Sequence, residues 1–104
     1  MSNYKAVIKL TKTMLNKHII DANNSVREWA KLSGVDYAKM KCGEKHSISA
    51  EFTDGTETVL NLYRTNNARG DRRISIKGIK AQAEIGDTVT FTLKGHKVIL
   101  EVSQ

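Results

Sequence analysis

Apolar and polar residues alternate along much of this chain, a pattern typical of strands that bury one face. The first predicted strand covers residues 4–10, and its apolar face is Tyr4, Ala6, Ile8 and Leu10. Asp54-Gly55 predicts a tight hairpin turn, because the glycine tolerates a positive φ. The alternation, together with the apolar pair Ile19-Ile20, predicts six further strands: residues 19–20, 46–53, 56–63, 74–76, 88–93 and 97–102.

Two segments near the start carry helical signals instead. Thr11 is placed to cap a short helix that ends near Lys17. Residues 24–33 form the strongest helix prediction, because Ser25 and Glu28 have the spacing of a capping box.

The helix over residues 24–33 has one apolar face, which assigns its tryptophan to the core. Val26, Trp29 and Ala30 recur on that face at helical spacing. A tryptophan so placed is far more often packed inside a protein than used as a stacking platform. Gly34 follows the helix, where a left-handed C-terminal cap favours glycine.

The remaining segments complete a mainly β pattern. Residues 36–43 are ambiguous and allow a short strand at 39–41, whereas residues 79–83 predict one helical turn. No proline, repeat or low-complexity tract marks a second domain. The elements predict a single mainly β (α+β) domain over residues 1–104, a seven-stranded open pseudobarrel with two short helices. In the sixth strand, Val89, Phe91 and Leu93 should face inward and the three threonines outward.

Positive charge is concentrated in residues 64–80, RTNNARGDRRISIKGIK. This stretch holds six basic residues against one acid, Asp71, and so carries +5 of the chain's net charge of +6. Such an excess predicts an anionic partner, with nucleic acid ahead of an acidic membrane surface.

The side chains of this basic stretch suit duplex recognition. Arginine forks onto a phosphate or a guanine edge, and asparagine both donates to and accepts from adenine. Asp71 would accept from a cytosine amino group or orient a neighbouring arginine, and both roles stay open. If Ile74 and Ile76 face the core, Lys77 faces outward as a phosphate contact. The candidate contact residues of this stretch are Arg64, Asn66, Asn67, Arg69, Asp71, Arg72, Arg73 and Lys77.

Other chemistry finds little support in the sequence. The single cysteine, Cys42, excludes an internal disulfide and fits a cytoplasmic protein. His46 and His96 are expected to be exposed, and the histidines lack metal-ligand spacing. The eleven acids are dispersed, which argues against a nuclease centre. No apolar run approaches the ~18 residues of a membrane span, and the first ten residues lack a signal-peptide core. We therefore expect a binding domain without cofactor, metal, membrane or small-molecule substrate.

Three short motifs and the order of the elements resemble the plant B3-type DNA-binding pseudobarrel, and in particular the N-terminal effector-binding domains of type IIE restriction endonucleases. IKLTKTMLNKHII, residues 8–20, is similar to the family's first strand, short helix, basic loop and second strand. RTNNARGDRR, residues 64–73, lies between two strands, where the family carries a DNA-reading arm. AEIGDTVTF, residues 83–91, is similar to the family's helix, GD turn and sixth strand. The likeness spans nearly the whole chain but departs at residues 21–34, where a longer helix stands and the plant proline is absent.

The resemblance implies that two arms grip the major groove of double-stranded DNA. The N-terminal arm would be Asn16, Lys17 and His18, extending to Asn23 and Asn24, with Lys12 beside it as a phosphate contact. The C-terminal arm would be residues 64–73. A packing role for His18 before Ile19 stays open. The implied protein is a monomeric effector or target-recognition domain of a restriction endonuclease, not itself an enzyme, that reads a short G/C-rich site such as CC(A/T)GG.

Other functions stay open at this point. A small β-barrel ribonuclease toxin would use His18 and an arm arginine for catalysis. An RNA- or single-strand-binding barrel would need stacking aromatics, and only 6% of the residues are aromatic. A swapped-hairpin transcription regulator shares the GD turn and would be an obligate dimer. A solvated basic loop without any partner is disfavoured by its self-repulsion.

Overall fold

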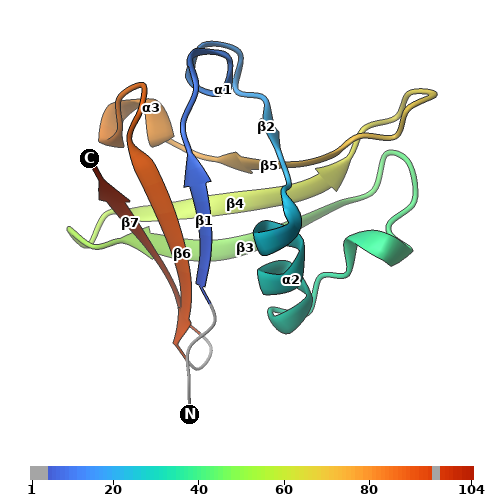
Figure 1. Cartoon of the computed structure of the whole chain (residues 1–104). Coiled ribbons are helices and arrows are strands. Elements are labelled where there is room, and N and C mark those ends of the chain that lie inside the picture. Colours follow the sequence, from blue (N-terminus) through green and yellow to red (C-terminus); the bar gives the residue numbers. More distant parts are fainter. Residues whose placement is uncertain (1–4, 95–96) are drawn as a thin grey trace.

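The computed structural model describes residues 5–94 and 97–104. These residues form one curled seven-stranded sheet with helices packed against it (Figure 1). The strands lie in the order β1-β6-β7-β3-β4-β5-β2. They are β1 (Lys5–Lys9), β2 (Ile20–Asp21), β3 (Lys45–Phe52), β4 (Glu57–Arg64), β5 (Arg72–Ile76), β6 (Thr88–Lys94) and β7 (Lys97–Ser103). The helices are α1 (Lys12–Lys17), α2 (Asn24–Leu32), α3 (Ile79–Gln82) and the 3-10 turn η1 (Tyr37–Lys39). The predicted mainly β, half-open barrel is confirmed, with three α-helices rather than two.

One strand pair differs from all the others in the sheet. β3 and β7 run parallel and pair only at Glu51↔Ile99 and Phe52↔Leu100, whereas the other neighbours are antiparallel. The sheet therefore consists of two ladders, β1-β6-β7 and β3-β4-β5-β2, that meet at this two-residue seam.

The first strand confirms the predicted alternation. Ala6, Ile8 and Leu10 are buried, whereas Val7 and Lys9 between them are exposed. Tyr4, at the predicted start of this strand, lies outside the described residues. So do Gly95, in the predicted turn between β6 and β7, and His96.

Helix α2 begins at Asn24, as predicted, but its N-cap lies two residues before the one that the capping box predicted. Asn23, not Ser25, is the N-cap: its Oδ1 accepts a hydrogen bond from the Val26 amide at 2.9 Å. Ser25 lies inside the helix, and its hydroxyl donates to Asn23 Oδ1 at 2.8 Å. Asparagine is as strong an N-cap as serine, and here the extended backbone at Asn23 leaves it in the capping position.

The other end of α2 confirms the predicted left-handed cap. Gly34 has φ +97°, and its amide donates to the Lys31 carbonyl at 3.1 Å. The Val35 amide donates to the Ala30 carbonyl at 2.8 Å, which completes a Schellman motif. The helix is therefore closed by hydrogen bonds at both ends.

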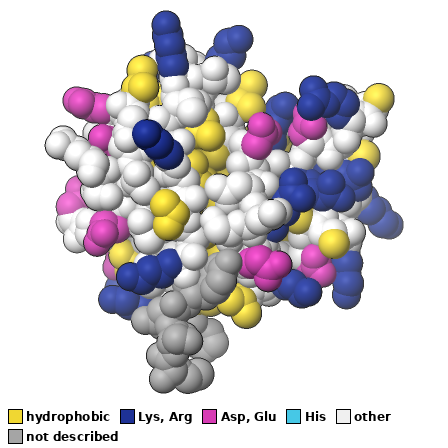
Figure 2. Space-filling view, viewed as in Figure 1, with side chains coloured by type: hydrophobic (Ala, Val, Ile, Leu, Met, Phe, Trp, Pro, Cys, Tyr) yellow, Lys and Arg dark blue, Asp and Glu magenta, His cyan; other side chains and the backbone are white. Residues whose placement is uncertain are grey.

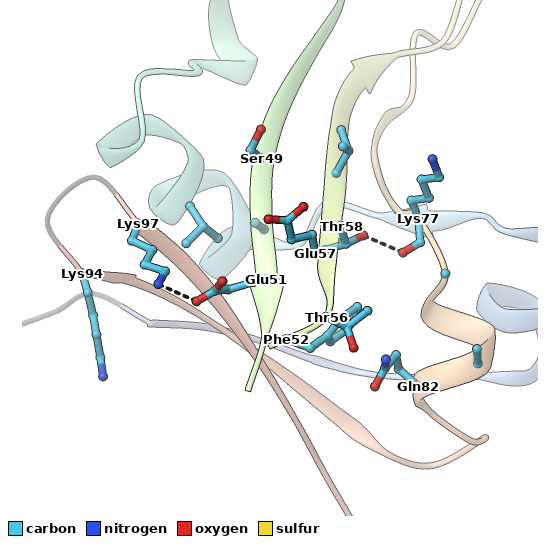
Figure 3. A pocket seen from close by; sticks show the side chains of 15 residues that line it. Ser49, Glu51, Phe52, Thr56, Glu57, Thr58, Lys77, Gln82, Lys94 and Lys97 are labelled. Carbon is cyan, nitrogen blue, oxygen red and sulfur yellow. Dashed lines mark hydrogen bonds and ion pairs between the residues drawn. The ribbon is translucent and has the colours of Figure 1, made fainter. Parts of the chain in front are cut away.

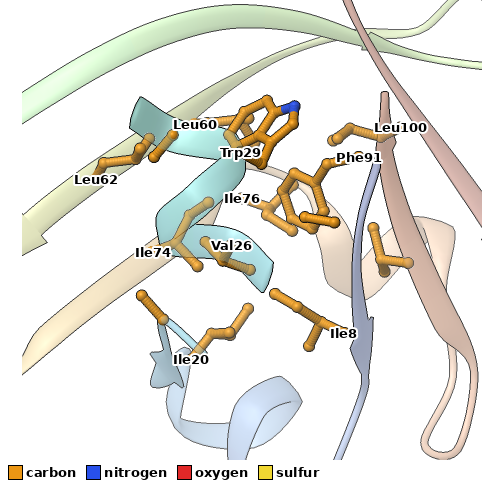
Figure 4. Close-up of a cluster of buried hydrophobic side chains, with 14 of the residues drawn as sticks. Ile8, Ile20, Val26, Trp29, Leu60, Leu62, Ile74, Ile76, Phe91 and Leu100 are labelled. Carbon is orange, nitrogen blue, oxygen red and sulfur yellow. The ribbon is translucent and has the colours of Figure 1, made fainter. Parts of the chain in front are cut away.

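The apolar face of α2 packs into the centre of the curled sheet (Figure 4). Val26, Trp29 and Ala30 are fully buried. The Trp29 ring lies 5.3 Å from that of Phe91 on β6, at an interplanar angle of 56°, a favourable tilted arrangement. Trp29 is thus a core residue, as its helical face predicted.

Two local predictions are wrong. Residues 37–39 form the 3-10 turn η1, not a strand at 39–41, because the Asp36 carboxylate accepts from the Ala38 amide at 3.0 Å and caps a turn. Thr92, expected to be exposed like the other two threonines of β6, is only 8% exposed; it lies between Lys5 of β1 and Ile99 of β7 in the sheet. Within the described residues, no helix combines the length and apolarity that crossing a bilayer requires.

Candidate nucleic-acid interface

The two predicted arms lie toward opposite ends of β5 (Figure 1). β2 pairs antiparallel with β5 through Ile20↔Ile74 and Asp21↔Arg73. Residues 16–18 of the N-terminal arm precede β2 and therefore approach the end of β5 near Lys77, while the C-terminal arm leads into its start. The extension at Asn23 and Asn24 follows β2 and lies toward the start of β5. The five residues of β5 span about 17 Å at ~3.4 Å per residue.

Figure 2 shows where positive charge lies on one face of the molecule. Lys and Arg side chains project over α1 at the top of the view. A larger group gathers on the right, over the region of the C-terminal arm, η1 and α2, with acidic side chains among it. Both arms therefore carry exposed basic groups, and the larger basic surface belongs to the C-terminal side.

The C-terminal arm is closed by its own hydrogen bonds. The Thr65 amide donates to the Asp71 carbonyl, and the Asp71 amide donates to Thr65 Oγ1, each at 2.8 Å. Asn67 Oδ1 accepts from the Gly70 amide at 2.9 Å and from the Thr65 hydroxyl at 3.0 Å. The loop is thus preformed, and the amide oxygen of Asn67 is part of its framework.

Arg64 braces this arm from within. Its Nε donates to the Gly70 carbonyl at 3.0 Å and its Nη1 to the Met40 carbonyl at 2.9 Å. Gly70 is buried with φ +59°, and a Cβ there would lie 2.7 Å from Arg64 Nε. The Arg64 guanidinium therefore ties the arm to the segment after η1 and points toward main-chain carbonyls.

The turn that follows η1 is hydrogen-bonded to the main chain of Arg64. The Gly43 amide donates to the Arg64 carbonyl at 2.8 Å, and the Arg64 amide donates to the Glu44 carbonyl at 3.0 Å. The Glu44 carboxylate pairs with His46 at 2.5 Å, and this hydrogen bond holds the pKa of Glu44 below its ordinary value. His46 is exposed, as predicted.

Asp71 orients two arginines of the arm. Its Oδ2 accepts from Arg73 Nη2 at 3.0 Å, and its Oδ1 lies 3.5 Å from Arg69 Nε. Arg73 is also paired with Asp21, 3.6 Å away, and its side chain is only 22% exposed. Arg69 is 83% exposed. Of the two roles open for Asp71, the geometry corresponds to that of orienting arginines.

Arg72 is held against η1 by backbone groups. Its Nε donates to the Tyr37 carbonyl at 3.3 Å, while the Tyr37 hydroxyl donates to the Arg73 carbonyl at 2.8 Å. Burial raises the pKa of the Tyr37 phenol well above its ordinary value. The hydroxyl therefore remains a donor, and η1 stays fixed to the start of β5.

Four members of the predicted C-terminal set are exposed. Asn66, Asn67 and Arg69 lie toward the tip of the arm, although the Asn67 amide oxygen is used within the loop, and Lys77 lies beyond the other end of β5. The Lys77 side chain is exposed, whereas its main chain is bonded to Val59 and to the Thr58 hydroxyl.

The N-terminal arm follows a short capped helix. Thr11 Oγ1 accepts from the Met14 amide at 3.3 Å, and Leu15 anchors α1 in the core. His18 ends α1 in the left-handed region, with φ +56° and ψ +32°, where non-glycine residues are uncommon. The predicted contact residues here, all exposed, are Lys12, Asn16, Lys17 and His18. Exposure of His18 speaks against the packing role that the sequence left open.

Asn23 and Asn24, the predicted extension of this arm, differ in their surroundings. The Asn23 side chain caps α2, and its Nδ2 donates to the Val7 carbonyl at 3.2 Å. Asn24 is exposed at the first residue of the helix. Of these two residues, only Asn24 presents an amide group to solvent without a hydrogen bond among the described contacts.

A cleft between α2 and η1 was missed by sequence reasoning. It has a volume of about 340 Å³, and its lining includes Arg27, Lys31 and Arg72. Arg27 and Lys31 are four residues apart on the polar face of α2, which is visible in the sequence. The sequence does not show that these two residues lie close to Arg72, because that proximity depends on how α2 packs against β5.

A second hollow, of about 920 Å³, is formed by β3, β4, β7 and α3 (Figure 3). Glu51 pairs there with Lys97 at 2.6 Å, and Glu57 lies opposite Glu51 in the ladder. Asp54 stands in the adjoining turn, where a hydrogen bond from the Thr56 amide lowers its pKa. Glu51 thus forms an ion pair and Asp54 caps a turn. Apart from Lys77, no predicted contact residue lines the hollow.

Within residues 5–94 and 97–104, no three His, Cys, Asp or Glu side chains form a group suited to a metal ion. Comparison with protein-family models finds no match for this chain, and comparison with curated proteins finds none either. The likeness to B3-type domains therefore rests on the sequence motifs and on the order of the elements.

Proposed function

We propose that this domain binds double-stranded DNA sequence-specifically, with its two arms in the major groove. The preformed C-terminal arm is the observation that carries the proposal. Its framework is bonded internally, so that Arg69 and Asn66 project from a fixed loop. A loop that is already ordered loses little conformational entropy on binding, and arginine and asparagine are the side chains suited to guanine and adenine edges.

The placement of the arms supports the same proposal. They are separated by roughly the 17 Å length of β5, so the two arms would straddle a major groove of ~12 Å, one at each edge. Lys12, Lys17 and Lys77 are exposed near the N-terminal arm and would hold phosphates, which gives salt-dependent affinity without reading sequence.

The resemblance extends the proposal to a larger protein. It implies a cytoplasmic, monomeric effector or target-recognition domain of a restriction endonuclease, whose catalytic domain lies outside this chain. The ribonuclease alternative is less well supported, because His18 and the arm arginines lie toward opposite ends of β5.

Selection from a random duplex library tests the proposal directly. We expect a short enriched motif and expect Arg69→Ala to lose about 1–3 kcal/mol of binding free energy on it. Lys5→Ala, which removes an exposed charge on β1, is the control and should bind normally. Equal losses on every duplex would make Arg69 a phosphate contact. A library that returns no motif, or tighter binding to single strands in gel-shift competition, would contradict sequence-specific duplex recognition.

A further inference from the structure

The cleft between α2 and η1 gathers positive charge from two separate parts of the chain. Arg27 and Lys31 come from α2, and Arg72 comes from the start of β5, directly after the C-terminal arm. We propose that this cleft holds one backbone phosphate of the duplex that the C-terminal arm grips. The inference rests on the proposed function and adds a contact that the resemblance does not assign.

The two arginines of the cleft are oriented by main-chain carbonyls. Arg27 Nε donates to the Ala22 carbonyl at 2.9 Å, and Arg72 Nε donates to the Tyr37 carbonyl at 3.3 Å. Each contact fixes the guanidinium plane and leaves the terminal nitrogens as donors. Among the described residues, neither guanidinium forms an ion pair with a carboxylate. Two oriented, unpaired guanidinium groups beside one cleft suit the tetrahedral oxygens of a phosphate.

The cleft also has two acids, which limit its positive charge. Asp36 and Glu28 line it with the three cations, so its formal net charge is +1. One oxygen of Asp36 is occupied, because it accepts from the Ala38 amide at 3.0 Å. Glu28 is exposed on the outer side of α2. A single monoanionic phosphodiester would balance this charge, whereas a dianionic ligand would exceed it.

The position of the cleft links it to the arm. Arg72 pairs with Arg64 across the β4–β5 ladder, and Arg64 is the residue that braces the arm. Two exposed lysines, Lys39 at the end of η1 and Lys41 between η1 and β3, continue the basic surface from the cleft toward the arm. A duplex strand running past the arm therefore meets donors on both sides. Contacts of this kind fix the register of the protein on DNA without reading bases.

Lys31→Gln is the cleanest variant, because the Lys31 side chain makes no hydrogen bond or ion pair within the described part of the chain. Arg27→Gln, which also loses the Ala22 contact, is the second variant, and Lys5→Gln is the matched control. We expect each cleft variant to weaken binding equally on selected and unrelated duplexes. The slope of log K against log salt should fall by about 0.9 for each lost contact. Lys5→Gln should leave the DNA affinity and the salt slope unchanged.

A methylphosphonate scan of the duplex identifies the source of the phosphate. Neutralising the backbone phosphate that the cleft holds should weaken DNA binding by the wild-type protein and cause a smaller loss in Lys31→Gln, which keeps only Arg27 and Arg72 as cations in the cleft. Equal losses in both proteins at every position would overturn the inference. The inference would also be overturned if the wild-type cleft binds inorganic phosphate but Lys31→Gln has the same affinity for duplex DNA as the wild-type protein. If the wild-type protein binds duplex but both cleft variants keep its affinity and salt slope, the inference alone fails. If the wild-type protein binds no duplex, the proposed function fails with it.

Discussion

The two arms reach a fixed shape in different ways. The C-terminal arm is held by side chains: Arg64, Thr65 and Asn67 close it, and Asp71 pairs with Arg69 and Arg73. The N-terminal arm is held mainly by the helix before it: a single side-chain cap, from Thr11, starts α1, and the left-handed backbone of His18 ends it. The number of candidate contact residues in an arm therefore does not indicate how many of them can contact DNA bases. Much of the C-terminal arm's polar chemistry maintains the loop, whereas the sparse N-terminal arm leaves all of its side chains exposed.

Among the tests of this difference between the arms, Arg64→Ala has the largest expected effect. It removes two hydrogen bonds from a charged donor and leaves the Gly70 and Met40 carbonyls without that partner. We expect a loss of about 3 kcal/mol in the free energy of unfolding, measured with urea. Arg69→Ala, at an exposed position, should stay within about 0.5 kcal/mol. Wild-type stability in Arg64→Ala, together with a loss of DNA affinity, would instead make Arg64 a contact residue.

Gly70→Ala tests the same hydrogen bond, between Arg64 Nε and the Gly70 carbonyl, by changing the acceptor residue. The new Cβ would lie 2.7 Å from Arg64 Nε and force the guanidinium off its carbonyls. Gly55→Ala is the matched control, because Gly55 also has a positive φ but no neighbouring atom within 4 Å. Both variants should lose about 1–2 kcal/mol through backbone strain, and Gly70→Ala about 1 kcal/mol more. Equal losses would show that Arg64 adapts at no cost.

The smallest expected effect concerns the N-terminal arm. His18→Gly removes the side chain and relieves the left-handed strain at φ +56°. The unfolded chain also gains freedom, so the stability should change by less than about 1 kcal/mol. We expect duplex affinity to fall, because the exposed imidazole is lost. His18→Asn, which tolerates the same backbone, is the control for conformation. Unchanged affinity in both variants would remove His18 from the interface.

Local signals in the sequence predicted most of the fold. Alternation located the strands, and Gly34 and Thr11 marked helix ends that the structure confirms. The error at Ser25 arose because two adequate caps stand two residues apart, and the chain uses Asn23. Residues 39–41 form no strand because Asp36 caps a turn just before them.

The candidate site was less predictable than the fold. A run of arginines in the sequence does not reveal which guanidinium groups meet carbonyls from distant segments. Arg64 reaches Met40, and Arg72 reaches Tyr37, across separations of 24 and 35 residues. These contacts require the packed position of η1, which no local pattern encodes.

The short parallel seam between β3 and β7 has a mechanical consequence. The two ladders share only two residue pairs among the described strands, and the chain crosses from one ladder to the other through α1 and α3. The angle between the ladders is therefore set mainly by the side chains packed between them, with little restraint from main-chain hydrogen bonds. Both arms are attached to the ladder that contains β5, because the N-terminal arm leads directly into β2, which pairs with β5. A slight rotation between the ladders would therefore keep the spacing of the arms and shift β1, β6 and β7 relative to both.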